Sequence, residues 1–209
     1  MSVARGACLG GAAISLLALS ARAQSGRPDS VVYLLATTSR FEVKTGKAGL
    51  FGFAGHEHII RARGVSGRVV YRPQLPSDSR VEIVVRADSL EVLTPPDTAE
   101  IRKVTQVMRT EVLHVDQYPM IRFLATSVTA TADGFRVQGR FTLVAATQDV
   151  SVDVQVEVGS DTLRAAGGFS VKQTDFGIKP FRGGPGGTVR VADRVTVSFE
   201  VIGIRAPQP

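Results

Sequence analysis

Ten residues in the second half of the chain, 149–158, read D-V-S-V-D-V-Q-V-E-V and alternate strictly between a polar side chain and valine. Because successive side chains of a β-strand point to opposite faces, this period of two places all the valines on one face. A helix would scatter the same valines around its whole circumference. The C-terminal segment repeats the pattern with Val195, Val197, Phe199 and Val201. Both segments therefore predict half-buried strands, and the inner face of the structure that they build is apolar.

Further strand-like segments, separated by turn signals, cover most of the remaining chain. They lie at 31–36, 40–44, 65–72, 81–93, 121–128, 135–143, 150–158, 163–174 and 189–202. Their regular spacing and short turns predict an antiparallel meander in which consecutive strands pair. An antiparallel sheet must protect its edge strands, and closure into a barrel removes those edges. The sequence therefore predicts an all-β fold, an antiparallel β-barrel of about eight strands.

One short helix is expected among these strands, directly after Pro95 and Pro96. Asp97 is a suitable N-cap residue, and Glu100 follows it at the spacing of a capping box. An apolar stripe at intervals of three and four residues follows, formed by Ile101, Val104, Met108 and Val112. Such a stripe packs against a neighbouring layer. We expect a single helical insertion near 97–112 that lies on the β-structure.

The N-terminus has the features of a secretory signal peptide. Arg5 supplies a positive charge, residues 9–19 form a short apolar run, and Ala21 and Ala23 fit a small-residue cleavage pattern. The run is too short to span a bilayer as a helix, and a frayed N-terminal helix is the alternative. Cleavage near Ala23 implies a periplasmic or secreted protein with no transmembrane span in the mature chain. The expected division is a signal peptide over 1–23, a polar leader over 24–30, one barrel domain over 31–204 and a tail over 205–209.

Cleavage also changes the charge and the cysteine content. It removes Arg5 and Arg22 from the 25 basic residues and none of the 19 acidic ones, which leaves a net charge of +4. This charge is mild for a nucleic-acid-binding protein, and the arginines are scattered singly, as on solvated strand faces. The only cysteine, Cys8, leaves with the signal peptide, so the mature chain has no disulfide and no cysteine metal site. No nucleic-acid partner is expected.

The predicted inner face mixes large and small side chains, with Ala125, Gly139, Ala165 and Gly167 between phenylalanines. Small inward residues leave room, and a barrel of about eight strands can hold one small ligand. The alternative is that side chains from opposing strands fill these gaps and make a solid core. The candidates for lining a ligand-holding interior are Phe123, Phe141, Val152, Val154, Phe169, Val197 and Phe199.

Three histidines offer a different chemistry. His56 and His58 point to the same side of an extended segment, and His114 is the only other histidine. Three imidazoles can bind a divalent metal such as zinc, although Ile60 breaks the His-Glu-x-x-His spacing of metalloproteases. The alternative is that the pair forms structural hydrogen bonds across a turn. No Ser-His-Asp arrangement or Gly-x-Ser-x-Gly motif is present, so we expect a binding protein and not an enzyme.

Several segments also match a known family in their order along the chain. They read G-F-A-G-H-E-H at 52–58, G-V-S-G-R-V at 64–69, E-V-L-H-V-D-Q-Y-P-M-I-R-F at 111–123, V-Q-G-R-F-T-L at 137–143, F-S-V at 169–171 and T-D-F-G-I at 174–178. Together they resemble the YceI family of secreted, polyisoprenoid-binding proteins, over about 32–203. Two positions depart from the family pattern: Lys103-Val104 with Gln106 stands where many members carry a basic-acidic-His pattern, and Gln173 stands where arginine is common. Both changes remove polar groups, so a ligand head group would be held differently here.

The resemblance implies a lipocalin-like extended barrel with a long apolar tunnel for an isoprenoid chain, such as a quinone tail. It also implies a homodimer as one expected state, and no cofactor apart from a bound isoprenoid or quinone-type lipid. Burial of one CH₂ contributes about 0.8 kcal/mol, so several isoprene units bind well without directional chemistry. The expected function is carriage or sequestration of a long apolar lipid. The alternatives are a metal-binding protein or metal-dependent enzyme using the histidines, and a solid-core secreted protein acting through its surface.

Overall fold

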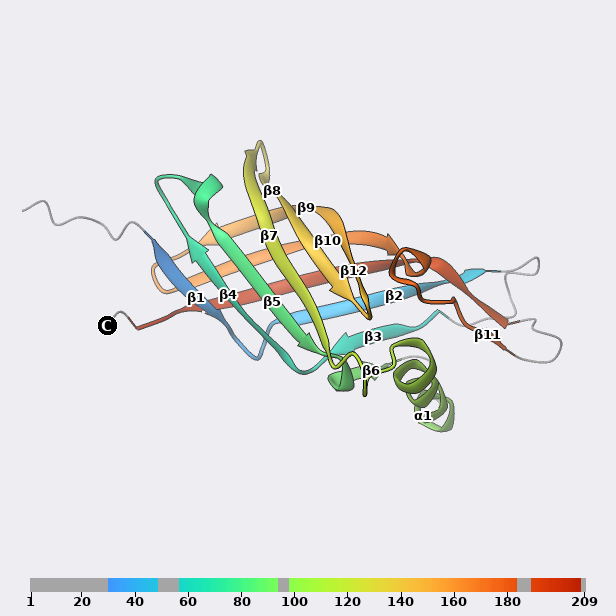
Figure 1. Cartoon of the computed structure of the whole chain (residues 1–209). Coiled ribbons are helices and arrows are strands. Elements are labelled where there is room, and N and C mark those ends of the chain that lie inside the picture. The colour runs from blue at the N-terminus through green and yellow to red at the C-terminus, as the bar shows by residue number, and fades with distance from the viewer. Residues whose placement is uncertain (1–29, 49–56, 94–97, 184–188, 208–209) are drawn as a thin grey trace, which may run out of the picture.

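A computed structural model describes residues 30–48, 57–93, 98–183 and 189–207. Eight antiparallel strands form a closed barrel within this part of the chain (Figure 1). In order around the wall they are β1 (Val31–Leu35), β4 (Val65–Tyr71), β5 (Arg80–Arg86), β7 (Met120–Thr131), β8 (Gly134–Leu143), β9 (Ala146–Val158), β10 (Thr162–Lys172) and β12 (Val189–Arg205). The barrel closes because β1 pairs with both β4 and β12. The predicted all-β antiparallel barrel is confirmed.

A side sheet extends the wall beyond the barrel along the other part of β12. It consists of β2 (Arg40–Ala48), β3 (Ile59–Ala62) and β6 (Leu90–Val92), and the two-residue strand β11 (Arg182–Gly183) pairs with β12 nearby. β1 and β2 follow each other along the same edge of β12, where Tyr33 lies opposite Arg205 and Phe41 lies opposite Phe199. The wall therefore forks between β1 and β2, one branch continuing into β4 and the other into β3.

The fork corrects part of the predicted pairing order. Consecutive strands do pair from β7 to β10. The front strands do not form a simple meander, because the chain crosses from one branch to the other after β1, β3, β5 and β6, although β2 still pairs with β3 and β4 with β5. The segment 81–93, predicted as one extended strand, is divided by the 3₁₀ turn η2 (Ala87–Ser89) into β5 in the barrel and β6 in the side sheet. β3 lies between the predicted strands 40–44 and 65–72, where no strand was predicted.

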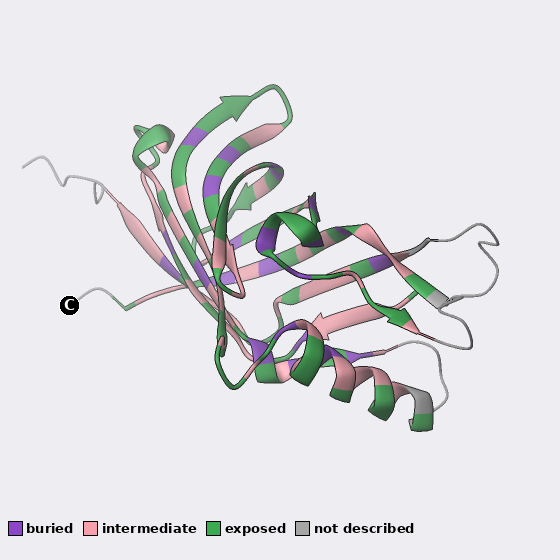
Figure 2. Cartoon of the chain, turned by 45° about the vertical axis from the view of Figure 1, so that its right-hand side comes forward, coloured by how far each residue is buried: buried purple, intermediate pink, exposed green. Residues whose placement is uncertain are grey.

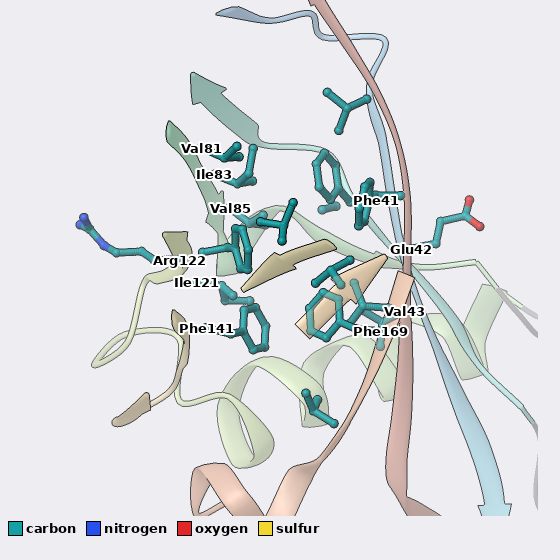
Figure 3. Close-up of a pocket in the computed structure, with 18 of the residues that line it drawn as sticks. Phe41, Glu42, Val43, Val81, Ile83, Val85, Ile121, Arg122, Phe141 and Phe169 are labelled. Atoms are coloured by element: carbon teal, nitrogen blue, oxygen red, sulfur yellow. The ribbon is translucent and has the colours of Figure 1, made fainter. Parts of the chain in front are cut away.

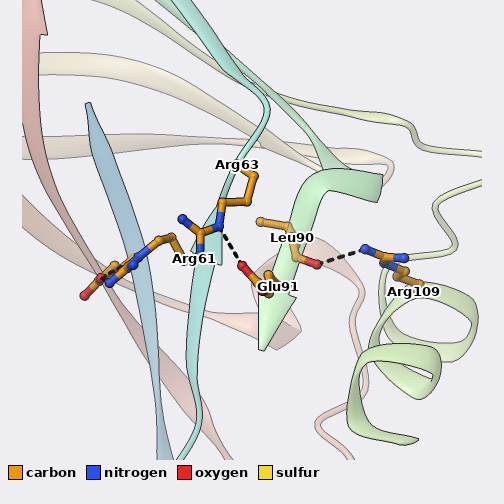
Figure 4. A network of polar contacts seen from close by, with 6 residues as sticks. Arg61, Arg63, Leu90, Glu91 and Arg109 are labelled. Atoms are coloured by element: carbon orange, nitrogen blue, oxygen red, sulfur yellow. Dashed lines mark hydrogen bonds and ion pairs between the residues drawn. The ribbon is translucent and has the colours of Figure 1, made fainter. Parts of the chain in front are cut away.

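Polar contacts hold the side sheet together (Figure 4). Arg61 on β3 donates from Nε to Glu42 on β2 at 2.9 Å, and the two residues are direct register partners. Arg63 donates from Nε to Glu91 on β6 at 2.6 Å. These exposed or half-exposed pairs contribute modestly to stability, but they fix which strands lie next to each other.

The period-two pattern of the sequence is visible as alternating burial (Figure 2). On β9 the side chains of Val152 and Val154 are buried, whereas those of Ser151 and Asp153 are exposed. β12 follows the same rule around Val195. The predicted inward direction is confirmed for the valines in the middle of both strands, whereas Val158 at the end of β9 is exposed.

The predicted helical insertion is also confirmed. α1 (Thr98–Val107) continues into a π-helical turn, η3 (Met108–Val112), in which the Leu113 N–H donates to the Met108 carbonyl at 2.9 Å. Met108 is buried in a core cluster with Leu90 and Val92 of the side sheet, and Ile101, Val104 and Val112 pack against the same cluster. The helix therefore covers the end of the barrel where the side sheet begins; its predicted cap, Asp97, lies outside the described residues.

β12 contains an irregularity that a neighbouring turn stabilises. Its register with β2 shifts between Val191 and Val195, as in a β-bulge. The 3₁₀ turn η4 (Gln173–Phe176) follows β10 and faces this bulge. Gln173 donates from Nε2 to the carbonyl of Ala192 within the bulge at 2.8 Å.

Asp193 forms a second link between the bulge and η4. Its carboxylate accepts the Thr174 N–H at 2.9 Å and the Thr174 hydroxyl at 2.8 Å. These hydrogen bonds, the backbone one first, lower the pKa of Asp193 below its ordinary value. The charged form of Asp193 therefore favours the folded state.

Two glycines of the inner wall lie beneath phenylalanine rings. A Cβ atom at Gly139 would lie 2.4 Å from the ring of Phe123, and one at Gly167 would lie 2.9 Å from the ring of Phe199. Gly167 and Phe199 are direct partners across β10 and β12. The prediction that these glycines themselves leave empty room is wrong, because the rings cover them. The glycines instead let the rings lie close to the wall, and this keeps ring volume away from the centre of the barrel.

We predict that Gly139→Ala destabilises the protein by about 1–3 kcal/mol, because the added methyl group meets Phe123 and the Leu124 carbonyl. Urea unfolding measures the change in free energy. Gln138→Ala, at an exposed neighbouring position, is the matched control and should stay within about 0.5 kcal/mol of the original protein. Phe123→Leu in the Gly139→Ala background should recover part of the loss. Equal stability of the two single variants would contradict the close ring contact.

We predict that Asp193→Asn lowers the melting temperature near neutral pH, and that the difference shrinks in acid. A carboxyl group with a lowered folded-state pKa stabilises the fold above its unfolded pKa, and this contribution is lost as the pH falls through the folded value. Thermal unfolding from about pH 7 down to about pH 2 measures the trend. Asp149→Asn is the control, since Asp149 is an exposed residue of β9. A pH-independent difference for Asp193→Asn would argue against the charge effect.

Candidate functional site: an apolar cavity inside the barrel

A cavity of about 280 Å³ lies inside the barrel and extends toward the end covered by the helix (Figure 3). Its wall combines side chains from seven barrel strands (β4, β5, β7, β8, β9, β10 and β12) with others from β2, β3, β6 and η3. The volume is near the lower end of the roughly 300–1,000 Å³ found for small-molecule pockets. Because both branches of the forked wall contribute, the cavity belongs to the barrel and the side sheet together.

The cavity is long and narrow. On β12 its wall runs from Val195 to Val201, a distance of about 20 Å at the usual rise of a strand. Tyr71 and Ser79 mark one end, at the connection between β4 and β5, and Thr45 and Gln173 lie at the helix-covered end. A volume of this size spread over such a length suits an extended chain better than a compact ring system.

The wall is almost wholly apolar. Its two charged residues, Glu42 and Arg122, direct their charged groups away from the cavity (Figure 3). Glu42 pairs with Arg61 in the side sheet, and Arg122 is exposed. The interior therefore provides burial and dispersion contacts, with no fixed charge from the described residues.

All the residues predicted to line a ligand-holding interior lie on the wall of this cavity. They are Phe123, Phe141, Val152, Val154, Phe169, Val197 and Phe199. Phe141 and Phe169 meet edge to face, with their ring centroids 5.4 Å apart. Phe199 stacks on Phe41 at 5.9 Å. That these side chains contact a ligand stays a prediction.

Other wall residues were not selected from the sequence. Phe41 and Val43 on β2 line the cavity, and the alternation R-F-E-V-K-T at 40–45 was a signal that could have identified them. Ile83 on β5 carries a similar signal. Thr45 gave none, because a polar side chain at an inward position has the same local sequence pattern as an outward one. Gln173 was noted as a departure from the family pattern, but its place on the cavity wall was not predicted.

The three histidines are not assembled into a site in the described part of the chain. There, no group of three or more His, Cys, Asp or Glu side chains is placed to hold a metal ion. His56 lies outside the described residues, so the three-histidine hypothesis stays untested. The backbone N–H of His58 donates to the Thr45 hydroxyl at 3.0 Å, and the carbonyl of His114 accepts two N–H groups of the following turn.

Comparison with solved structures places the fold among known barrels. Over 80% of this chain and 98% of the other, it is similar to BcnA of Burkholderia cenocepacia, with a TM-score of 0.63 and 18% sequence identity. It is also similar to a polyisoprenoid binding domain from Saccharophagus degradans that is implicated in plant cell wall breakdown. The TM-score is 0.56 and the sequence identity is 14%, over 85% of this chain and 99% of that one. The YCEI protein of Campylobacter jejuni is similar with a TM-score of 0.55 and a sequence identity of 12%, over 71% of this chain and 85% of the other.

No curated protein matches the chain. None of the helices in the described part has the length and apolar character needed to span a bilayer. The sequence model of the YceI-like domain family matches residues 36–202. This range is most of the sequence and contains nearly all of the barrel and its side sheet. This match agrees with the barrel geometry and with the structural neighbours, and the chain belongs to the YceI-like family.

Proposed function

We propose that this protein binds a long apolar lipid, such as an isoprenoid or a quinone-type lipid, inside its barrel and carries or sequesters it. The continuous apolar wall along about 20 Å of β12 is the observation that carries the proposal. The similar domain from Saccharophagus degradans is a polyisoprenoid binding domain, which supports the same ligand class for this protein. The cavity argues against the alternative of a solid-core protein that acts through its surface.

The energetics of such binding need no directional chemistry. Each buried CH₂ contributes about 0.8 kcal/mol, so one five-carbon isoprene unit contributes up to about 4 kcal/mol before ordering costs. Association and immobilisation of the chain offset a substantial part of this gain. A few units inside the cavity therefore suffice for micromolar binding or better.

The N-terminal sequence supports a proposal for where this activity takes place. Residues 1–23 have the features of a signal peptide, which supports a periplasmic or secreted carrier released by cleavage near Ala23. An apolar lipid has low solubility in that aqueous compartment, so a barrel that encloses the chain would keep it dispersed. A homodimer stays a further prediction.

Native mass spectrometry of protein purified from a membrane-containing host tests the proposal directly. We expect a co-purified lipid that organic solvent extracts and that mass measurement identifies as a long-chain apolar compound. The proposed function would be contradicted if the purified protein carried no lipid and also failed to bind added isoprenoids.

We predict that affinity increases with isoprenoid chain length and then reaches a plateau. Each added unit buries more apolar surface until the chain fills the cavity, after which further units stay in water. Displacement of a fluorescent lipid by a series of isoprenoid alcohols measures the dissociation constants. An early increase of about tenfold or more per unit is expected. A flat series would show that the lumen is not the binding site.

We predict that Val197→Trp weakens lipid binding about tenfold or more, because Val197 lies on the cavity wall and indole fills part of the lumen. Ser198→Trp is the matched control, since Ser198 is the exposed neighbour on the outer face of β12. The chain has no tryptophan of its own, so each variant carries a single fluorophore. Residual lipid binding should change the emission of the inner tryptophan and leave that of the outer one unchanged. Equal affinities of the two variants would contradict the assigned site.

A further inference from the structure

Two polar residues, Thr45 and Gln173, are buried in the described part of the chain. Their exposures are 8% and 9%, and both lie on the cavity wall. Burial of a polar group is unfavourable unless hydrogen bonds compensate for the lost water. Hydrogen-bonding capacity that contacts within the protein leave unused is then available to a polar part of the ligand.

Both residues lie at the helix-covered end of the cavity. Thr45 on β2 is opposite Val195 on β12, and Val195 is opposite Val171 on β10. Gln173 follows Val171 by two residues and begins η4. Toward the middle of the cavity the inward residues of β2 are Val43 and Phe41, so this part of the wall is apolar, and the opposite end carries the hydroxyl groups of Tyr71 and Ser79, of which Ser79 accepts the Arg72 N–H.

Part of the hydrogen-bonding capacity of these side chains is unused. The Thr45 hydroxyl accepts the His58 N–H at 3.0 Å, which leaves its own hydrogen available to donate. Gln173 donates from Nε2 to the Ala192 carbonyl at 2.8 Å, and this contact fixes the orientation of the amide. Its Oε1 and second N–H have no partner among the described residues. Among the described residues, Nε of Arg109 is the only polar side-chain atom that is fully enclosed and lacks a hydrogen-bond partner. Because Oε1 of Gln173 also lacks a partner, it is not fully enclosed and borders open space.

Among the described residues, no charged side chain joins Thr45 and Gln173 on the cavity wall, and the nearby Asp193 carboxylate is bound to Thr174 of η4. Glu42 and Arg122 point away from the cavity, and Arg109 directs its Nη2 to the Leu90 carbonyl at 3.2 Å without joining the cavity wall (Figures 3 and 4). An anionic head group would therefore lose its water without gaining a counter-charge from the described residues. A neutral group that donates or accepts a hydrogen bond would match Thr45 and Gln173.

We propose that the helix-covered end of the cavity is a hydrogen-bonding subsite for an uncharged oxygen-bearing group, a hydroxyl or a carbonyl, on the apolar ligand. Thr45 donates from its hydroxyl, and Gln173 accepts through Oε1 or donates through its second N–H. The same subsite selects against carboxylates and phosphate esters. This inference rests on the proposed lipid-binding function.

Three probes with the same twenty-carbon isoprenoid chain test the subsite: the hydrocarbon, the alcohol and its monophosphate ester. Their dissociation constants come from displacement of a fluorescent lipid on the mature protein. We expect the alcohol to bind about 2- to 10-fold tighter than the hydrocarbon, which is the range for a neutral hydrogen bond. The monophosphate should bind about tenfold or more weaker than the alcohol, because its charge is desolvated without a partner.

Substitutions assign the preference to the two residues. Gln173→Leu and Thr45→Val should each reduce the ratio of alcohol affinity to hydrocarbon affinity, and a far-UV circular dichroism spectrum like that of the original protein shows that the barrel is intact. Thr45→Ser keeps the hydroxyl and should keep the preference. Gln155→Leu, on the exposed face of β9, is the matched control. Gln173→Lys places a cation at the subsite and should make the monophosphate bind tighter than the alcohol.

The outcomes separate this inference from the function on which it rests. The subsite proposal is wrong if the protein binds the hydrocarbon and the alcohol equally, or binds the monophosphate as tightly as the alcohol. The proposed lipid-binding function is not contradicted by either result. A preference for the alcohol that persists in Gln173→Leu and Thr45→Val also overturns the assignment. If none of the three probes binds, the lipid-binding function itself fails.

Discussion

Closure of the barrel and the presence of a side sheet both depend on the shared edge of β12. This strand is 17 residues long, and one of its edges pairs with β10 from Arg194 to Ile204. Its other edge is divided between β2 and β1, which lie end to end. Unpaired strand edges expose N–H and C=O groups, and the divided edge satisfies them for both branches of the wall. The cavity is long because this strand is long, and it reaches beneath α1 because β12 continues past the barrel.

An interior that stays open is unfavourable for stability. A cavity lowers the free energy of unfolding by about 24 cal/mol for each Å³. A cavity of about 280 Å³ therefore costs about 7 kcal/mol relative to a filled core, which is comparable to the whole free energy of unfolding of many domains. The wall nevertheless keeps this space, and Gly139 and Gly167 allow two phenylalanine rings to lie against the wall. Larger residues at these positions would push the rings toward the centre. A wall built in this way is better explained by a guest that replaces the missing contacts than by stability alone.

The sequence predicted the features that depend on local periodicity. Valine alternation on β9 and β12 identified the inner face, and the stripe from Ile101 to Val112 identified the helix. The fork was missed because it depends on which strand pairs with which, and β3 is a four-residue segment, I-I-R-A, without alternation. The role of Gly139 was misjudged because a glycine beneath a ring and a glycine beside a void look alike in sequence. Thr45 and Gln173 were not selected because their inward positions follow from tertiary contacts and not from local pattern.

An apolar cavity alone discriminates poorly between ligands, because the hydrophobic effect is non-directional and proportional to buried area. The length of the cavity limits how much chain is buried, so it selects for chain length but not for chemical identity. Directional selectivity requires polar groups whose orientation is fixed before the ligand arrives. In this barrel, η4 and the bulge of β12 provide that fixation, since the hydrogen bond from Gln173 to Ala192 orients the amide that borders the cavity. The irregular backbone at this end of β12 therefore also positions a polar group that can distinguish the end of a ligand chain from its middle.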